Sequence, residues 1–199
     1  MEILVIRHGE SEADLLEVHE GRADFPLTHL GVSQAERMAS YIKRNYQPDV
    51  ILSSPLIRAS KTAEILQSAT GCELIFVKEL MEYNNGILAG MSREEASRKY
   101  PLPKGGRPIH IPIQEGESDL EFFHRVESVF HRIIHEYGNL NRIAIVSHGG
   151  FISNFLKIFL GLSSTDKSVF STGDTGIHLV EIRENRRVIK FMNSTAHLL

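Results

Sequence analysis

Two histidines, His8 and His148, each follow a short apolar run and precede a glycine. The two runs, residues 3–6 and 143–146, have the length and composition of buried β-strands. In doubly wound sheets, ligands bind at the carboxyl ends of the strands near a switch point, so we expect the two imidazoles to share one pocket. An imidazole in such a pocket can act as a nucleophile or exchange a proton with the substrate.

Two arginines are expected to join the histidines. Arg7 directly precedes His8. Arg58 lies on the first turn of a predicted helix that follows a third apolar run, residues 50–52, and the N-terminus of a helix favours an anion. Guanidinium groups match phosphate oxygens two at a time and stay charged at any accessible pH. The combination predicts a phosphate site, although each residue alone is weak evidence.

The elements that position these residues follow from the periodicity. Short β-branched or apolar runs alternate with longer stretches of helical period, which is typical of βαβ units. We predict an α/β fold with three α/β/α layers around a mostly parallel, mixed sheet. Strands are expected at residues 3–6, 50–52, 74–77 and 143–146, and a final antiparallel hairpin at residues 178–182 and 187–192 around a polar turn at residues 183–186.

Four helices are predicted from their first residues. Ser54-Pro55 supplies an N-cap followed by a proline at the first helical position, and Ser118 with Glu121 forms a capping box. Thr28 and Ser92 are the other predicted N-caps. The helices are expected at residues 31–44, 55–69 and 93–99, and from residue 118 to near residue 138.

Length and composition limit the class of protein. The chain has 199 residues, 42% of them hydrophobic, a formal net charge of -3 and one cysteine, Cys72. We expect a single domain over residues 1–199 that binds neither nucleic acid nor membrane. Without an internal disulfide or a leader after Met1, the expected compartment is the reducing cytoplasm. The oligomeric state does not follow from the sequence.

A long segment, residues 101–117, is rich in proline and glycine and has no helical or strand period. Long irregular segments in compact domains are usually functional, so we predict a lid here. Three basic side chains in it, Lys104, Arg107 and His110, are candidates for contact with a second anionic group of a substrate.

Taken together, the motifs resemble the histidine phosphatase superfamily, also called the phosphoglycerate mutase-like family. The segments that carry the resemblance span most of the chain in the family's order: Leu4–Ser11, Phe25–Thr28 with Gly31, Ser53–Pro55 through Arg58 to Ala63, Glu82, Gly116–Ser118 and Val146–Gly149. The resemblance implies the phosphoglycerate mutase-like fold, which agrees with the α/β fold predicted above.

The resemblance also implies roles for individual residues. His8 is the phosphorylated nucleophile, Arg7, Arg58 and His148 complete the phosphate pocket, and Glu82 is the proton donor. Glu79 lies nearby and is the alternative acid. The remaining residues expected to bind substrate phosphate are Gly9, Ser11, Asp14, Glu20, Gly21 and Gly149, and no cofactor or metal is implied.

Two features depart from the family's pattern. The family commonly has asparagine where this chain has Asp14, whose carboxylate would repel phosphate unless it turns away, for example toward Arg22, or selects a substrate with a basic group. The chain also has no tryptophan, whereas the family has a tryptophan-containing segment after the acid. Substrate identity therefore does not follow from the resemblance.

Three histidines at helical spacing, His124, His131 and His135, suggest a metal site, but they lie on the polar side of their predicted helix. A solvated face is the favoured interpretation.

The leading functional hypothesis is a metal-independent phosphatase that hydrolyses phosphomonoesters of small metabolites through a phosphohistidine. Two arginines and an imidazole can neutralise the negative charge on the phosphoryl oxygens, which a metal ion neutralises in other phosphoryl-transfer enzymes. The alternatives are a phosphoglycerate mutase, which carries a longer insertion between the acid and the second histidine, and a non-catalytic phosphate-binding or interaction module.

Overall fold

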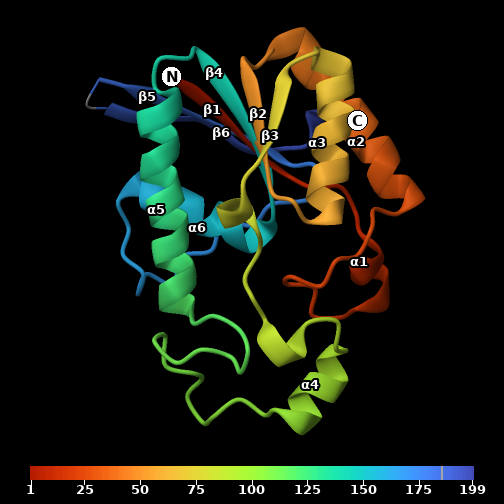
Figure 1. The fold of residues 1–199 in the computed structure, drawn as a ribbon, viewed down its shortest axis with the longest axis vertical. Helices are drawn as coiled ribbons and strands as arrows, with labels where there is room; N and C mark the ends of the chain where they lie inside the picture. Colours follow the sequence, from red (N-terminus) through yellow and green to blue (C-terminus); the bar gives the residue numbers. More distant parts are fainter. Residues whose placement is uncertain (185) are drawn as a thin grey trace.

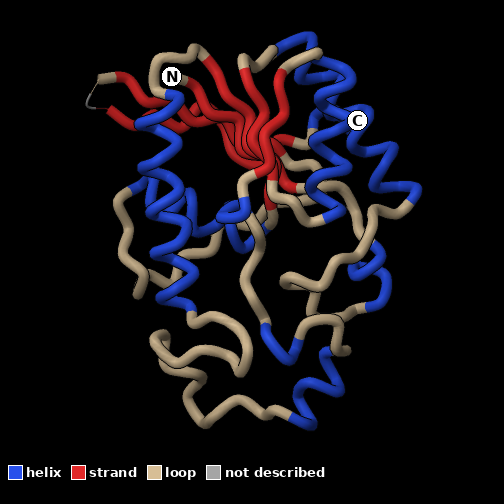
Figure 2. Tube along the Cα trace, in the orientation of Figure 1, coloured by secondary structure: helices blue, strands red, loops and turns tan. Residues whose placement is uncertain are grey.

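The computed structural model describes residues 1–184 and 186–199 (Figure 1). Its strands form one sheet in the order β3-β2-β4-β1-β5-β6 (Figure 2). The strands are β1 (Glu2–Arg7), β2 (Val50–Ser53), β3 (Glu73–Phe76), β4 (Arg142–Ser147), β5 (Ile177–Arg183) and β6 (Arg186–Ser194). All six predicted strands are confirmed, whereas Asn185, in the predicted turn of the last hairpin, lies outside the described residues.

The sheet is mixed, as predicted. Strands β1 to β4 are joined by parallel pairs, and β5 pairs antiparallel with both β1 and β6. In the pairing of β1 with β4, Arg7 stands opposite Ser147. The residues that follow, His8 and His148, therefore leave the same edge of the sheet from neighbouring strands, which is the condition for a shared pocket.

Helices cover both faces of the sheet, so the three-layer prediction is confirmed (Figure 1). The helices are α1 (Glu12–Leu16), α2 (His29–Asn45), α3 (Ile57–Thr70), α4 (Arg93–Lys99), α5 (Asp119–Tyr137) and α6 (Gly149–Leu160), with 3-10 turns η1 (Lys78–Leu80), η2 (Gly86–Leu88) and η3 (Ala196–Leu198). Alternate strand residues point to opposite faces, which gives each face its own core.

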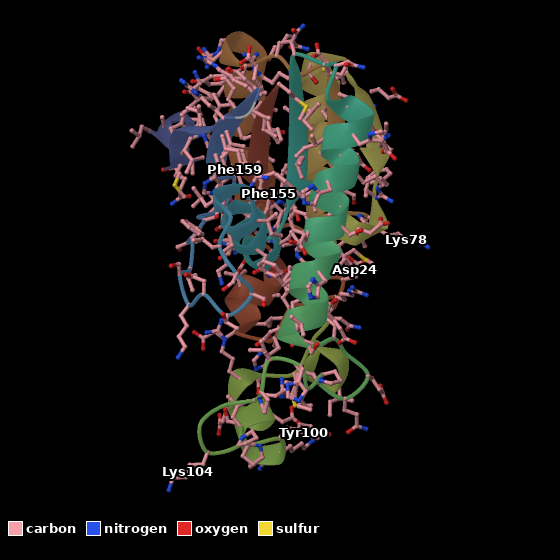
Figure 3. All side chains as sticks on the ribbon, turned by 90° about the vertical axis from the view of Figure 1, so that its left-hand side faces the viewer. Asp24, Lys78, Tyr100, Lys104, Phe155 and Phe159 are labelled. Carbon is pink, nitrogen blue, oxygen red and sulfur yellow. The ribbon has the colours of Figure 1, made fainter. Side chains whose placement is uncertain are left out.

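One core lies between the sheet and helices α5 and α6. It holds Val5 and Ile145 of the strands with Phe130, Phe155 and Phe159 of the helices, and Figure 3 shows the last two inside the molecule. The other core packs alternate strand residues against the small and apolar side chains of α2 and α3. Burial of these aromatic side chains fixes the position of α6, whose first turn follows His148.

Three predicted helix caps are confirmed, and one is wrong. Thr28, Ser92 and Ser118 accept main-chain N–H groups at the starts of α2, α4 and α5. Helix α3 begins at Ile57 rather than at Pro55, and its N-cap residue is Leu56. The Ser54 hydroxyl accepts the N–H of Leu56 at 3.3 Å and also bonds to the imidazole of His148. Two helices, α1 and α6, were not predicted.

Residues 101–117 contain neither helix nor strand and lie with α4 beyond the carboxyl ends of the strands (Figure 1). The side chain of Lys104 points outward at the far end of the molecule (Figure 3). The role of this segment as a lid stays a prediction. In the described part of the chain, no helix is long and apolar enough to cross a membrane.

Candidate active site

His8 directly follows β1, and its imidazole is 1% exposed. Its Nδ1 lies 2.8 Å from the carbonyl oxygen of Gly9. A carbonyl only accepts hydrogen bonds, so Nδ1 carries the proton and Nε2 keeps its lone pair. Burial, together with the charges of Arg58 and Arg7, holds the pKa of His8 well below the ordinary value for histidine. At neutral pH the imidazole is therefore uncharged, with its lone pair on Nε2.

Arg58 lies in the first turn of α3 and is fully buried. Its Nη2 donates to the carbonyl of Gly21 at 2.7 Å and its Nη1 to the carbonyl of Ala23 at 3.0 Å. The third nitrogen, Nε, lies 3.3 Å from Nε2 of His8. Two main-chain carbonyls thus fix the guanidinium so that its Nε–H donates to Nε2 of His8.

The second histidine, His148, is the N-cap residue of α6 and is also 1% exposed. Its ring centroid lies 5.1 Å from that of His8, and its Nε2 is hydrogen-bonded to the Ser54 hydroxyl at 2.8 Å. Its buried Nδ1 has no hydrogen-bond partner among residues 1–184 and 186–199. Burial and the charge of Arg58 lower the pKa of His148 well below its ordinary value. The two imidazoles thus lie next to each other, as predicted.

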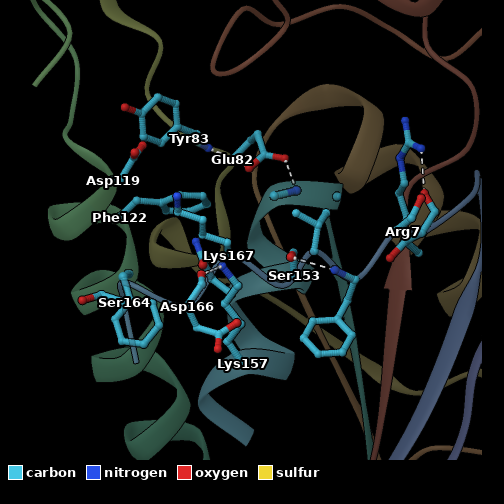
Figure 4. A pocket seen from close by; sticks show the side chains of 18 of the residues that line it. Arg7, Glu82, Tyr83, Asp119, Phe122, Ser153, Lys157, Ser164, Asp166 and Lys167 are labelled. Atoms are coloured by element: carbon cyan, nitrogen blue, oxygen red, sulfur yellow. Dashed lines mark hydrogen bonds between the residues drawn. The ribbon is translucent and has the colours of Figure 1, made fainter. Parts of the chain in front are cut away.

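Arg7 ends β1 and is held by three acceptors. Its Nη1 donates to the carbonyl of Thr172 at 2.9 Å (Figure 4). Its Nη2 lies 3.2 Å from a carboxylate oxygen of Asp174 and 3.6 Å from one of Asp14. Its Nε is buried and unpartnered within the described residues. The side chain lines the same cavity as His8.

The predicted contact of Asp14 with Arg22 is wrong. Asp14 is instead the third residue of α1, where its Oδ2 accepts the main-chain N–H of Ser11 at 2.9 Å and the Ser11 hydroxyl at 3.1 Å. Arg22 pairs with Glu117 at 3.6 Å. The Asp14 carboxylate is held by a capping box that the sequence analysis did not include, and it remains near Arg7.

Glu82 lies between η1 and η2. Its Oε2 accepts the N–H of Gly150 at 2.8 Å, and its Oε1 accepts the N–H of Tyr83 at 2.8 Å (Figure 4). The alternative acid, Glu79, instead pairs with Arg132 at 2.9 Å on the surface of α5. Glu82 is a lining residue of the cavity at His8, and Glu79 is not.

Arg125 of α5 holds the segment that carries Glu82. It donates to the carbonyls of Glu79 at 2.7 Å, Met81 at 2.8 Å and Glu82 at 3.1 Å, and it pairs with Glu117 at 2.6 Å. Four acceptors on one guanidinium make this segment rigid. The sequence analysis missed Arg125, because its acceptors are mostly carbonyls and leave no pattern in the side chains.

A glycine directly follows each histidine, and a residue without a Cβ allows close approach of the main chain. At Gly9 it does, because an added Cβ would lie 2.4 Å from the carbonyl oxygen of Gly31. At Gly149 a Cβ would meet nothing within 4 Å, whereas at Gly150 it would lie 2.5 Å from Oε1 of Glu82. Near the second histidine, the close approach is therefore at Gly150 rather than at Gly149. Gly150 was not predicted.

The cavity at His8 has a volume of about 860 Å³ and extends away from the sheet between α5, α6 and residues 164–172 (Figure 4). Arg7, His8, Glu20, Glu82 and Gly149 line it together with side chains not predicted for the site: Tyr83, Ile109, Asp119, Phe122, Phe123, Ser153, Asn154, Lys157 and most of residues 164–172.

The candidate contacts for a second anionic group are not where the sequence analysis placed them. The structure describes the whole 101–117 segment, and of its residues Ile109 alone lines the cavity. Lys104, Arg107 and His110 do not line it. Lys157 and Lys167 do. Phe123 belongs to the apolar face of α5, and helical periodicity does not distinguish a core position from a pocket wall.

The three histidines of α5, His124, His131 and His135, are exposed. Within the described residues, no three or more His, Cys, Asp or Glu side chains are arranged to hold a metal ion. The solvated-face interpretation of these histidines is consistent with their exposure.

Comparison with known proteins covers nearly the whole chain. The model of the histidine phosphatase superfamily (branch 1) matches residues 3–195. Phosphoserine phosphatase 1 of Hydrogenobacter thermophilus is 28% identical over 201 residues, covering 100% of this chain and 94% of that protein. A relative from Escherichia coli named "Probable phosphoglycerate mutase GpmB" is 30% identical over 93% of this chain and 86% of its own.

A solved structure shows the same fold. The phosphoserine phosphatase mutant of Entamoeba histolytica, in complex with phosphoserine, superimposes with a TM-score of 0.82 at 30% identity, covering 100% of this chain and 99% of that one. The predicted resemblance and fold are confirmed, and the family and the names of these relatives support a phosphatase enzyme. The chain belongs to the histidine phosphatase superfamily, branch 1.

Proposed function

We propose that this protein hydrolyses phosphomonoesters of small metabolites through a phosphohistidine on His8, without a metal. The observation that carries the proposal is the hydrogen bond of Nδ1 to the Gly9 carbonyl, which leaves the lone pair of Nε2 beside Arg58 in the cavity. A buried, uncharged imidazole in this tautomer is the nucleophile that phosphoryl transfer needs.

In the first step, Nε2 of His8 attacks phosphorus, and the bond from phosphorus to the ester oxygen breaks. Arg58 and Arg7 stabilise the charge on the three remaining phosphoryl oxygens, and His148 can donate one further hydrogen bond from its ring. The leaving alkoxide takes a proton from Glu82, which lines the same cavity.

In the second step, water attacks the phosphohistidine. Glu82, now a carboxylate, accepts a proton from the water, the nitrogen–phosphorus bond breaks, and His8 regains its lone pair. Arg125, which holds the main chain at Glu82, acts as a positioning residue in both steps.

The cavity supports a small metabolite as substrate. Its volume of about 860 Å³ is within the range for small-molecule sites. Tyr83, Phe122 and Phe123 line one part, and Val169, which is 78% exposed, lines another. An alcohol with an apolar portion can pack there. The names of the relatives, phosphoserine phosphatase and phosphoglycerate mutase, denote enzymes of small phosphorylated molecules.

Hydrolysis of p-nitrophenyl phosphate in excess EDTA, from about pH 5 to 8, tests this function. We expect turnover by the intact protein, no turnover by His8→Ala, and unchanged turnover by His135→Ala, which removes an exposed histidine of α5. Full activity of His8→Ala contradicts the proposal, and so does activity that EDTA abolishes.

The same preparations separate the alternatives. A phosphoglycerate mutase, which the E. coli relative favours, requires a phosphorylated primer and returns the phosphoryl group to phosphoglycerate. A non-catalytic module binds inorganic phosphate in calorimetry without turnover. Either result replaces the phosphatase proposal.

A further inference from the structure

The carboxylate of Glu20 lies in the anion site itself. Its Oε1 is 3.1 Å from Nε of Arg58 and accepts the Ser11 hydroxyl at 2.6 Å, and its Oε2 is 3.9 Å from Nε2 of His8. The side chain is 18% exposed. Glu20 therefore forms an ion pair with Nε of Arg58, the nitrogen whose N–H also donates to Nε2 of His8.

A phosphoryl group needs this space. Phosphorus must approach Nε2 of His8 to about 3–3.5 Å before attack, and its oxygens must reach the Arg58 N–H. Oε2 of Glu20 lies 3.9 Å from the same nitrogen, so the carboxylate is close to the space that the phosphoryl group needs. A carboxylate and a phosphate dianion in contact also repel each other strongly in a buried site.

We propose that the Glu20 carboxylate competes with the phosphoryl group for the site between His8 and Arg58, and that a bound phosphomonoester displaces it. The inference rests on the proposed function, since it requires a phosphate site at His8. It assigns Glu20 a role in selectivity rather than direct binding of phosphate.

The structure also offers a place for the displaced side chain. Glu20 lines a second, polar cavity of about 470 Å³ whose walls include His19, Asn85 and Arg93. Arg7 and Glu20 line both cavities, so the Glu20 side chain stands between them. In the second cavity, Arg93 is a cation that does not line the cavity at His8, and it can replace Arg58 as the carboxylate's partner.

Competition of this kind discriminates between ester and product. A phosphomonoester gains contacts with the large cavity through its alcohol portion, and these offset the displacement of Glu20. Inorganic phosphate has no such portion, so it binds weakly and is released readily. The need to displace Glu20 lowers the affinity for inorganic phosphate more than it lowers the affinity for the phosphomonoester.

The test is the dissociation constant of inorganic phosphate, measured by titration calorimetry on the full chain. Glu20→Gln keeps the shape of the side chain and removes its charge, and we expect it to bind phosphate about tenfold more tightly than the intact protein. Glu20→Ala should shift the constant in the same direction. Glu12→Gln, which removes an exposed carboxylate of α1, is the control and should leave the constant unchanged.

Arg93→Met tests the displaced position. It should weaken phosphate binding in the intact protein, where Glu20 needs a new partner, and have no effect in the Glu20→Gln background. Equal phosphate affinity of the intact protein and both Glu20 variants overturns the inference but leaves the phosphate site standing. Absence of phosphate binding by every variant and by the intact protein overturns the proposed function as well.

Discussion

Single atoms determine the chemistry of the site. The tautomer of His8 is set by the main-chain carbonyl of the next residue, and the direction of Arg58 is set by two further carbonyls. Each of these groups is buried and has little freedom to reorient. Preorganised donors of this kind stabilise the charge of a transition state without the cost of rearrangement.

Glu82→Gln tests the acid at the residue scale. The amide cannot protonate an alkoxide, so we expect hydrolysis of alkyl phosphates to fall by about 10²–10⁴-fold. Hydrolysis of p-nitrophenyl phosphate should fall much less, because nitrophenolate leaves without a proton. Steady-state rates on both substrates check this, and equal losses on the two contradict the role of Glu82 as acid.

Much of the site could be predicted at this scale. Arg7, His8, Arg58, Glu82 and His148 follow strand ends or match family motifs, and the structure brings them together. The partner of Asp14 and the position of the Glu20 carboxylate could not be predicted. Both depend on which way a side chain turns within an irregular segment, and that direction is decided by neighbours distant in sequence.

At the scale of elements, β1, β4 and α3 carry the residues of the proposed phosphate site. Helix α5 carries Arg125, which holds the segment of the proposed acid, Glu82. The strands and three of the caps were predictable from local patterns. The start of α3 was not, because the Ser54 hydroxyl bonds both to the N–H of Leu56 and to the imidazole of His148, which is contributed by another strand end. The short helix α1 was missed because its apolar residues, Leu15 and Leu16, are exposed.

Arg125→Met tests the link between α5 and the acid. Without the guanidinium, the segment at Glu82 loses three carbonyl contacts. We expect kcat for alkyl phosphates to fall about tenfold or more, with a smaller effect on p-nitrophenyl phosphate.

The matched control for this prediction is Arg132→Met on the same helix. Arg132 pairs with Glu79 on the surface, and an exposed pair contributes about 1 kcal/mol or less to stability. Its kinetics should be those of the intact protein. If Arg125→Met lowers the rates on both substrates equally, Arg125 is structural and does not position the acid.

At the scale of the whole molecule, the stability of the fold depends on buried, uncharged histidines in and near the candidate active site. His178 in β5 is an example: its Nδ1 accepts the N–H of Asn193 at 3.2 Å, and its Nε2 lies 2.9 Å from the Thr172 hydroxyl. Burial lowers the pKa of His178 to about 4. Thr172 in turn supplies the carbonyl that holds Arg7, so the same residues serve the fold and the site.

The coupling predicts a pH dependence of stability. Unfolding returns His178 to a pKa of about 6.5, so the unfolded state binds more protons between about pH 6.5 and 4. The free energy of unfolding should then fall by about 1.4 kcal/mol per pH unit from this residue as pH decreases through that window. The shifts of His8 and His148 act in the same direction.

Urea unfolding at about pH 7.5 and 5.5, with the intact protein and His178→Gln, isolates this contribution. The difference in stability between the two proteins should shrink at the lower pH, because only the intact protein gains a proton at residue 178 when it unfolds. A difference that is independent of pH contradicts the neutral state of His178.

The central claim is a covalent phosphohistidine at Nε2 of His8. The most direct measurement is rapid acid-free quenching of the Glu82→Gln protein during turnover of p-nitrophenyl phosphate, followed by intact-mass and fragment analysis. The account predicts one phosphoryl group, on His8, and none in the His8→Ala protein treated in the same way. Turnover with no phosphoenzyme, or a phosphoryl group on any other residue, contradicts it.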